Sequence, residues 1–186
     1  MLTRDLMKLI DQTITDIWKY EIKSDYEMGW LLKEDTLKNA LYFHLRSKLG
    51  TVFDYNNIRI FTEFTDCDFK STGYRPDMVI ARVNMNAPSE YWGDDVTECL
   101  AVIEIKYKTG FSTSNAIYHD YEKLKDYAKG IGTTAKLYMA TIWEYEDDPT
   151  TWVRQNAAWA KGRLTELNAS YIRNSDREMQ FYVCPH

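Results

Sequence analysis

Hydrophobic residues recur at helical spacing in two segments near the N-terminus. The first segment spans 2–19, and we predict a helix there. A second helix is predicted over 33–49, where Gly50 is a suitable C-terminal stop. Residues 20–30 between them are mixed aromatic and acidic, which indicates a connector. The two hydrophobic stripes consist of Leu6, Leu9, Ile10, Ile14, Ile17 and Trp18, and of Leu37, Ala40, Leu41, His44, Leu45 and Leu49.

Apolar runs bounded by turn residues predict five strands further along the chain. The runs cover 57–64, 75–83, 99–107, 134–143 and 179–183. Helices are predicted over 115–129 and 151–167, although Gly162 weakens the second pattern. A short turn between the first two strands indicates a hairpin, and the helix between the third and fourth strands indicates a parallel crossover. We therefore expect an α/β fold in which helices flank a mixed sheet.

The composition adds limits on domain number and setting. With 186 residues, of which 45% are hydrophobic and 27% charged, the chain is expected to form one globular domain. No run approaches the roughly 18 apolar residues of a membrane span, and the N-terminus does not resemble a signal peptide. Cys67, Cys99 and Cys184 are widely spaced without a C-x-x-C pair, which argues against a disulfide framework and a zinc ribbon. These features predict a cytoplasmic protein without a membrane association.

The formal net charge of −5 argues against nucleic-acid binding through bulk charge. Any contact with nucleic acid then needs a local basic patch. Candidate members of such a patch are Lys70, Lys106, Lys108, Lys123 and Lys125.

Charged side chains interrupt two of the predicted strands. Asp77 follows Pro76 at the start of one strand, whereas Glu104 and Lys106 lie two residues apart in the most apolar strand and project to one face. Ionised groups in a core are costly unless they are paired or bind a metal. The two carboxylates and the backbone carbonyl of Ile105 are the oxygen ligands that Mg²⁺ or Mn²⁺ prefers. Such an ion and a lysine together activate a water and stabilise charge on a phosphate.

These segments resemble a known family. Pro-Asp at 76–77 and Glu-x-Lys at 104–106, inside a helix–strand–strand–strand–helix–strand order, are similar to the PD-(D/E)XK nuclease superfamily and its restriction-endonuclease-like fold. The resemblance covers 33–143, with 1–32 as an N-terminal helix and connector and 144–186 as a C-terminal helix and strand of the same domain. It implies that Asp77 and Glu104 bind metal and that Lys106 positions the attacking water. It also implies a glutamate on the helix before the first strand, for which Glu34 is the first candidate, and Glu63, near the end of the first strand, is the second.

Residues around this motif have two interpretations each. Asp120, Lys123 and Tyr127 share one helical face. That face either lies toward the site, so that Lys123 contacts a phosphate, or is solvated and holds an Asp–Lys pair. Arg75 either reaches a substrate phosphate or caps the hairpin, and Lys108 is a further candidate for nucleic-acid binding.

The three histidines do not indicate a metal or nucleophile motif. His44 lies on the apolar stripe of its helix and is expected in the core or at its boundary. We expect His119 to be solvated and His186, the last residue, to be disordered.

The sequence therefore favours a Mg²⁺- or Mn²⁺-dependent nuclease that acts through a metal-activated water, with DNA favoured over RNA as the substrate. A nuclease for RNA, or for modified or structured DNA, is a further interpretation, and the sequence does not choose between these substrates. The alternative is the same fold as a non-catalytic module that binds nucleic acid or protein, which the acidic net charge favours. A salt bridge from Lys106 to Glu104 or Asp77 is the purely structural alternative. Because no recognition domain is evident, a homodimer or a partner protein is a further expectation.

Overall fold

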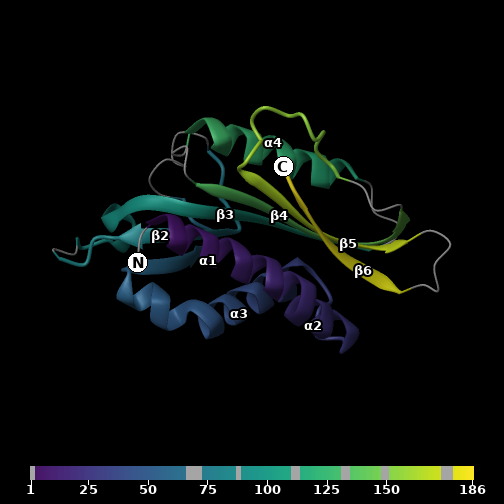
Figure 1. The fold of residues 1–186 in the computed structure, drawn as a ribbon, viewed down its shortest axis with the longest axis horizontal. Helices are drawn as coiled ribbons and strands as arrows, with labels where there is room; N and C mark the ends of the chain where they lie inside the picture. The colour runs from purple at the N-terminus through teal and green to yellow at the C-terminus, as the bar shows by residue number, and fades with distance from the viewer. Residues whose placement is uncertain are drawn as a thin grey trace.

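The fold is an α/β arrangement in which a six-stranded mixed sheet has helices on both faces (Figure 1). It is taken from a computed structural model. The structure describes residues 3–65, 73–86, 89–109, 114–130, 135–147, 151–172 and 178–186. Cys184 is a free thiol, whereas Cys67 and Lys70 lie outside these ranges.

The N-terminal third is more helical than the sequence pattern predicts. Helix α1 (Thr3–Asp16) is followed by η1 (Ile17–Ile22) and α2 (Lys23–Glu27), so the predicted connector is wrong over most of its length. The reason is that Ile17, Trp18 and Ile22 are all buried and continue the apolar stripe.

Helix α3 (Glu34–Tyr55) also extends beyond its predicted end. Phe53 is fully buried and prolongs the stripe past Gly50, which is tolerated inside the helix. The chain reverses at Asn57, whose φ of 54° lies in the left-handed region.

The first three strands form an antiparallel sheet, as predicted for the hairpin. Strand β1 (Ile58–Thr62) pairs with β2 (Met78–Val83), which pairs with β3 (Val96–Lys108). The short η3 (Trp92–Asp95) precedes β3.

The crossover after β3 is parallel, as predicted. Helix α4 (Asn115–Gly130) leads from β3 to β4 (Lys136–Asp147), and the two strands pair in parallel. The order helix, three strands, helix and strand is therefore present from α3 to β4.

The predicted helix over 151–167 is wrong. Residues 151–163 form turns, and strand β5 (Leu164–Ile172) then pairs in parallel with β4 and antiparallel with β6 (Met179–Pro185). Residues 164–170 are buried on both faces, so this part of the strand lacks the alternation that identifies a half-exposed strand. Gly162, with a φ of +70°, allows the turn that starts it.

His186 is ordered and buried, which corrects the expectation of disorder. Its side chain is 1% exposed and its backbone N–H donates to the Leu164 carbonyl (3.0 Å). His44 is partly buried beside Asp25, and His119 is exposed, as predicted.

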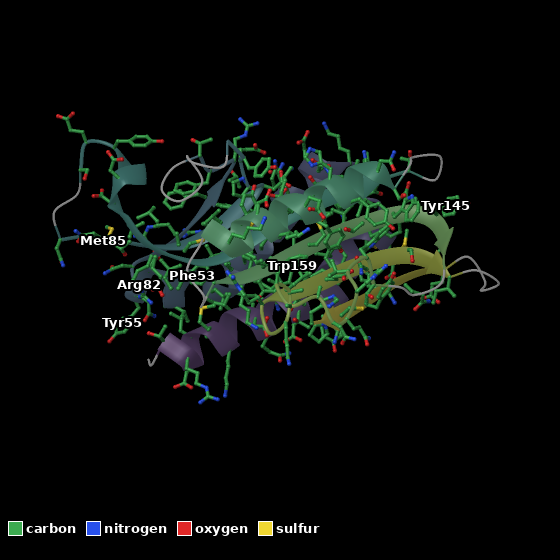
Figure 2. The ribbon with its side chains drawn as sticks, turned by 90° about the horizontal axis from the view of Figure 1, so that it is seen from above. Phe53, Tyr55, Arg82, Met85, Tyr145 and Trp159 are labelled. Atoms are coloured by element: carbon green, nitrogen blue, oxygen red, sulfur yellow. The ribbon has the colours of Figure 1, made fainter. Side chains whose placement is uncertain are left out.

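Two hydrophobic cores lie on opposite faces of the sheet. Helices α1 and α3 pack with Ile103 and Ile105 on one face, whereas α4 and residues 151–163 cover Val102, Leu137 and their neighbours on the other. Glu104 and Lys106 project to the α4 face because they alternate with Ile103 and Ile105. Figure 2 shows Tyr145 at the end of the sheet opposite Tyr55, Arg82 and Met85.

No helix among the described residues combines the length and the apolarity needed to cross a bilayer.

Candidate active site

Asp77 and Glu104 come together where β2 begins. Met78 pairs with Ile103, so the preceding residue, Asp77, lies opposite Glu104. Oδ2 of Asp77 accepts a hydrogen bond from the backbone N–H of Ile105 (2.8 Å). Because β2 begins at Met78, no β2 carbonyl is paired with the Ile105 N–H, and the Asp77 carboxylate accepts its hydrogen bond instead. The N–H and carbonyl of one strand residue point to the same side, so the Ile105 carbonyl also faces Asp77.

Glu104 is a carboxylate with no exposed surface and few donors. Tyr127 OH donates to its Oε1 (3.1 Å), and Lys123 Nζ lies 3.3 Å from its Oε2. Burial and the nearby charge of Asp77 raise the pKa of Glu104 to about 8, Asp120 adds to the shift, and Lys123 opposes it. Burial likewise raises the pKa of Asp77, although the Ile105 N–H and Lys38 counteract it.

Lys106 lies between two carboxylates from different helices. Its Nζ is 3.1 Å from Oε2 of Glu34, the first residue of α3, and 2.9 Å from Oδ2 of Asp120 on α4. Burial acts to lower the pKa of Lys106, but Asp120 and Glu34 outweigh it and raise that pKa above its ordinary value. Lys106 therefore carries its proton at neutral pH and is held in place from both faces of the sheet.

The face of α4 that contains Asp120, Lys123 and Tyr127 is turned toward the site. Lys123 bridges Asp120 Oδ1 (2.6 Å) and Glu104, and Tyr127 contacts Glu104. The structure therefore combines parts of both interpretations: Asp120 and Lys123 form an ion pair, and this pair borders the site. The contacts of Lys123 are to carboxylates, so its role at a phosphate stays a prediction.

The outer edge of the site contains a residue that the sequence did not suggest. Lys38 pairs with Asp77 Oδ1 (3.6 Å) and also with Glu63, to which Arg75 Nε pairs through Oε2 (2.6 Å). Lys38 lies one helical turn after Glu34, and this i,i+4 spacing is the signal that would have identified it. Glu63 has a φ of 54°, a strained conformation that is typical of functional sites.

The predicted nucleic-acid contacts differ in exposure. The Arg75 side chain is 61% exposed, and Lys108 is partly buried at the end of β3. Lys106 and Lys123 are each held by two carboxylates, and Lys125 pairs with Glu122 on α4. In the described region, the predicted basic patch is therefore largely neutralised.

The donor set fits a hard divalent cation. Two neighbouring carboxylates with raised pKa values and a backbone carbonyl at the same strand edge match the oxygen ligands of Mg²⁺ and Mn²⁺. A cation between them would relieve the repulsion that raises the Glu104 pKa. Within the described ranges, no three His, Cys, Asp or Glu side chains form a ready-made metal group, so solvent or substrate oxygens would complete the coordination.

Comparison of the chain with protein-family models, with curated proteins and with solved structures gives no match.

Proposed function

We propose that this protein is a metal-dependent nuclease that hydrolyses phosphodiester bonds in DNA. One observation carries the proposal: Asp77 and the fully buried Glu104 lie opposite each other, with Lys106 two residues further along the same strand. Two neighbouring buried carboxylates repel each other unless a cation binds both, and Lys38 and Lys123 each pair with one of the two. The element order from α3 to β4 supports a restriction-endonuclease-like fold, which we propose on the resemblance in sequence.

Each residue then has a stated role. Asp77, Glu104 and the Ile105 carbonyl would hold Mg²⁺ or Mn²⁺. When bound, such a cation polarises the phosphate and lowers the pKa of a water. Lys106, which stays protonated, donates hydrogen bonds to the attacking water or to a phosphate oxygen and so orients the displacement.

Two carboxylates position the lysine for this role. Glu34 and Asp120 hold the Lys106 ammonium from α3 and α4, respectively. Lys38 and Arg75, which pair with Glu63 beside Asp77, lie where a substrate phosphate would exchange for these pairings. The acidic side chains thereby hold the side chains of Lys106, Lys38 and Arg75 in position until the substrate binds.

Cleavage assays test the proposal directly. The parent is incubated with plasmid, single-stranded and branched DNA and with RNA, in Mg²⁺, Mn²⁺ or EDTA. Asp77→Asn, Glu104→Gln and Lys106→Met should each lower the rate by about 100-fold or more. Glu122→Gln is the matched control, because Glu122 lies on α4 with a side chain that is 67% exposed. If Asp77→Asn and Lys106→Met cleave as fast as the parent, the proposal is wrong.

A non-catalytic binding module is the second candidate function. The observation that favours it is the pairing of Lys106 and Lys123 with two carboxylates each, as in a purely structural network. Calorimetry separates the two functions. The nuclease requires Mg²⁺ or Mn²⁺ binding that Asp77→Asn abolishes, whereas the module predicts binding that is absent or insensitive to this change.

A further inference from the structure

Four aromatic residues form a continuous row beside the candidate active site. The Trp143 ring stacks on Tyr145 (centroids 5.1 Å apart, 17° between planes) and contacts Trp152 (5.2 Å). Trp152 in turn meets Tyr118 of α4 edge-on (5.5 Å). Tyr118 and Tyr145 are 51% and 47% exposed, so both ends of the row are open to a ligand. We call these four residues the aromatic row.

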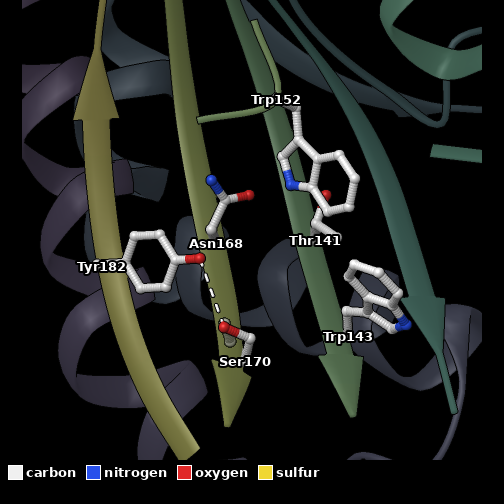
Figure 3. Close-up of a pocket in the computed structure, with 7 residues that line it drawn as sticks. Thr141, Trp143, Trp152, Asn168, Ser170 and Tyr182 are labelled. Carbon is white, nitrogen blue, oxygen red and sulfur yellow. Dashed lines mark hydrogen bonds between the residues drawn. The ribbon is translucent and has the colours of Figure 1, made fainter. Parts of the chain in front are cut away.

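A small polar pocket opens at the foot of the aromatic row (Figure 3). Thr141 on β4 and Asn168 on β5 are ladder partners, and Figure 3 shows the Trp152 indole over Thr141 with Asn168 beside it. The pocket volume is about 10 Å³, which is the space of one water molecule. Its remaining lining residues are Trp143, Ala169, Ser170 and Tyr182.

Three residues that line this pocket have a buried polar atom without a protein partner in the described ranges, Trp143 Nε1 among them. Thr141 Oγ1 and Asn168 Oδ1 have no hydrogen-bond partner in the described part of the chain, although their residues are only 1% and 2% exposed. The Asn168 amide nitrogen donates to Glu166 (3.1 Å), which fixes the amide so that Oδ1 is left for the pocket. Unsatisfied groups of this kind are rare in folded proteins and require an explanation. Together they offer one acceptor and one hydroxyl to a polar ligand.

The pocket adjoins the candidate active site. Thr141 lies directly opposite Lys106 in the β3–β4 ladder, and Trp143 lies opposite Lys108. Neighbouring strands are about 4.8 Å apart. A ligand over the aromatic row is therefore one strand away from the lysine that is proposed to act at the phosphate.

The charge of the molecule indicates how a nucleic acid would gain affinity here. The net charge is −5, and the lysines of the site are paired with carboxylates. Phosphate contacts alone are thus a weak source of binding, whereas stacking of bases on aromatic rings does not depend on net charge. Stacking needs a base whose face is accessible, which a continuous duplex does not offer.

We propose that the aromatic row binds an unpaired nucleobase, so that the substrate is single-stranded or locally unpaired DNA. The part of this inference that concerns cleavage rests on the proposed function. A base is too large for the pocket itself. It stacks on the exposed tyrosine at either end of the row, while Thr141 and Asn168, which are 1% and 2% exposed, hold a water in the pocket.

Fluorescence anisotropy in EDTA tests the base site without cleavage. A labelled 12-nucleotide single strand and a hairpin duplex of the same composition are titrated with the parent, Tyr145→Leu, Tyr118→Leu and Thr141→Val. We expect the parent to prefer the single strand and each tyrosine variant to bind it about tenfold more weakly. Tyr55→Leu is the matched control, because Tyr55 is 84% exposed at the opposite end of the sheet and should bind as the parent does.

The outcomes separate this inference from the proposed function. Equal affinity of the parent for strand and duplex, or equal binding by Tyr145→Leu and Tyr55→Leu, overturns the base site even if DNA is cleaved. Loss of single-strand binding in Tyr145→Leu, with parental binding in Asp77→Asn, supports the base site even if no substrate is cleaved. Thermal melts of all variants establish that the fold is intact, and the substituted tyrosines are exposed enough to make this the expected result.

Discussion

Two glutamates at the same level of the sheet differ in the hydrogen-bond donors that surround them. Glu104 on β3 and Glu166 on β5 are both ladder partners of Met139 on β4, and both are fully buried. They therefore share a face, a depth and a chemical type, and only their donors differ. Burial alone does not distinguish a structural carboxylate from a candidate ligand, but the supply of donors does.

Glu166 is surrounded by donors. Its two oxygens accept from Tyr121 OH (2.9 Å) and from the backbone N–H groups of Trp152 (2.9 Å) and Val153 (3.1 Å). Asn168 Nδ2 and His186 Nε2 (2.7 Å) complete the set. These partners come from α4, the 151–163 turns, β5 and the C-terminal end of β6. Glu166 thus links four parts of the structure around one carboxylate.

Among the described residues, the donors to Glu104 are Tyr127 and Lys123, and two further carboxylates lie near it. Asp77 and Asp120 both raise its pKa. The site around Glu104 is consequently short of hydrogen-bond donors in a way that the site around Glu166 is not. This contrast is the physical basis for assigning a structural role to one glutamate and metal binding to the other.

Substitution by glutamine should separate the two glutamates by the largest margin. At Glu166 both oxygens accept at least two hydrogen bonds, so either orientation of a glutamine sets its NH₂ against donors. We expect Glu166→Gln to lower the free energy of unfolding by about 3–5 kcal/mol. Glu104→Gln should not lower it at pH 7, because the neutral amide avoids the cost of a buried charge and the Tyr127 hydroxyl can accept as well as donate. Urea unfolding of both variants measures this difference, and equal losses would remove the distinction.

The pH dependence of stability should follow from Glu104. Its pKa is about 8 in the folded protein against 4.5 as the ordinary value. Because the pKa of Glu104 is higher in the folded protein, the native state binds more protons than the unfolded state between these two pH values. The contribution of Glu104 to the free energy of unfolding is therefore complete below pH 4.5 and is lost as pH rises through 8. We expect the parent to lose on the order of 3 kcal/mol over this range in EDTA, relative to Glu104→Gln.

Urea unfolding at a series of pH values from 4.5 to 9 measures that loss. Adding Mg²⁺ should reduce it, because the cation binds the ionised carboxylate and favours its charged form. If the parent and Glu104→Gln have parallel pH curves in EDTA, the assigned environment of Glu104 is wrong.

A matched pair of tyrosines on α4 tests the same contrast on a smaller scale. Tyr121 donates to Glu166, and Tyr127 donates to Glu104. Tyr121→Phe should cost about 1.5–3 kcal/mol of stability, as expected for a hydrogen bond to a charged group. Tyr127→Phe should cost less at pH 7, where Glu104 is largely protonated.

Tyr127→Phe should also move the alkaline loss of stability to higher pH. The hydroxyl stabilises the ionised carboxylate, so its removal raises the Glu104 pKa further. Tyr121→Phe serves as the control, and it should leave that transition unchanged. A shift of equal size in both variants would contradict the separate environments of the two glutamates.

The sequence predicted the Glu104 site far better than the Glu166 site, for a physical reason. Asp77, Glu104 and Lys106 are charges in otherwise apolar strands, and this pattern is visible without any structure. Asp120, Lys123 and Tyr127 follow from helical spacing. The i,i+4 spacing places Lys38 on the same side of α3 as Glu34, but only the packing of α3 against the sheet brings Lys38 to Asp77.

The Glu166 site could not be predicted because its strand was mistaken for a helix. Strand β5 is buried on both faces over 164–170, so its polar residues do not alternate with apolar ones in a recognisable way. His186 contacts Glu166, which is 20 residues earlier in the chain, and its backbone pairs with Leu164. Neither contact leaves a local pattern in the sequence. Long-range partners of this kind become visible only in the folded chain.

The smallest expected effect concerns exposed charge on the Glu104 side of the sheet. The Arg75 side chain is 61% exposed and pairs with Glu63 near Asp77, so it can exchange this partner for a phosphate at little cost. We expect Arg75→Gln to weaken DNA binding about two- to fourfold and to reduce the salt dependence by about one phosphate contact. The maximal cleavage rate should not change, because Arg75 does not contact Glu104 or Lys106.

Lys125→Gln is the control for Arg75→Gln, since Lys125 pairs with Glu122 on α4 and should not affect binding. Binding curves at several salt concentrations distinguish the two variants. An equal loss in both would mean that DNA responds to overall charge rather than to the Glu104 side of the sheet. In the proposed function, Glu104 matters because a phosphate reaches the neighbouring Asp77 and Lys106. Without such access, Glu104 and Glu166 would differ only in their contributions to protein stability.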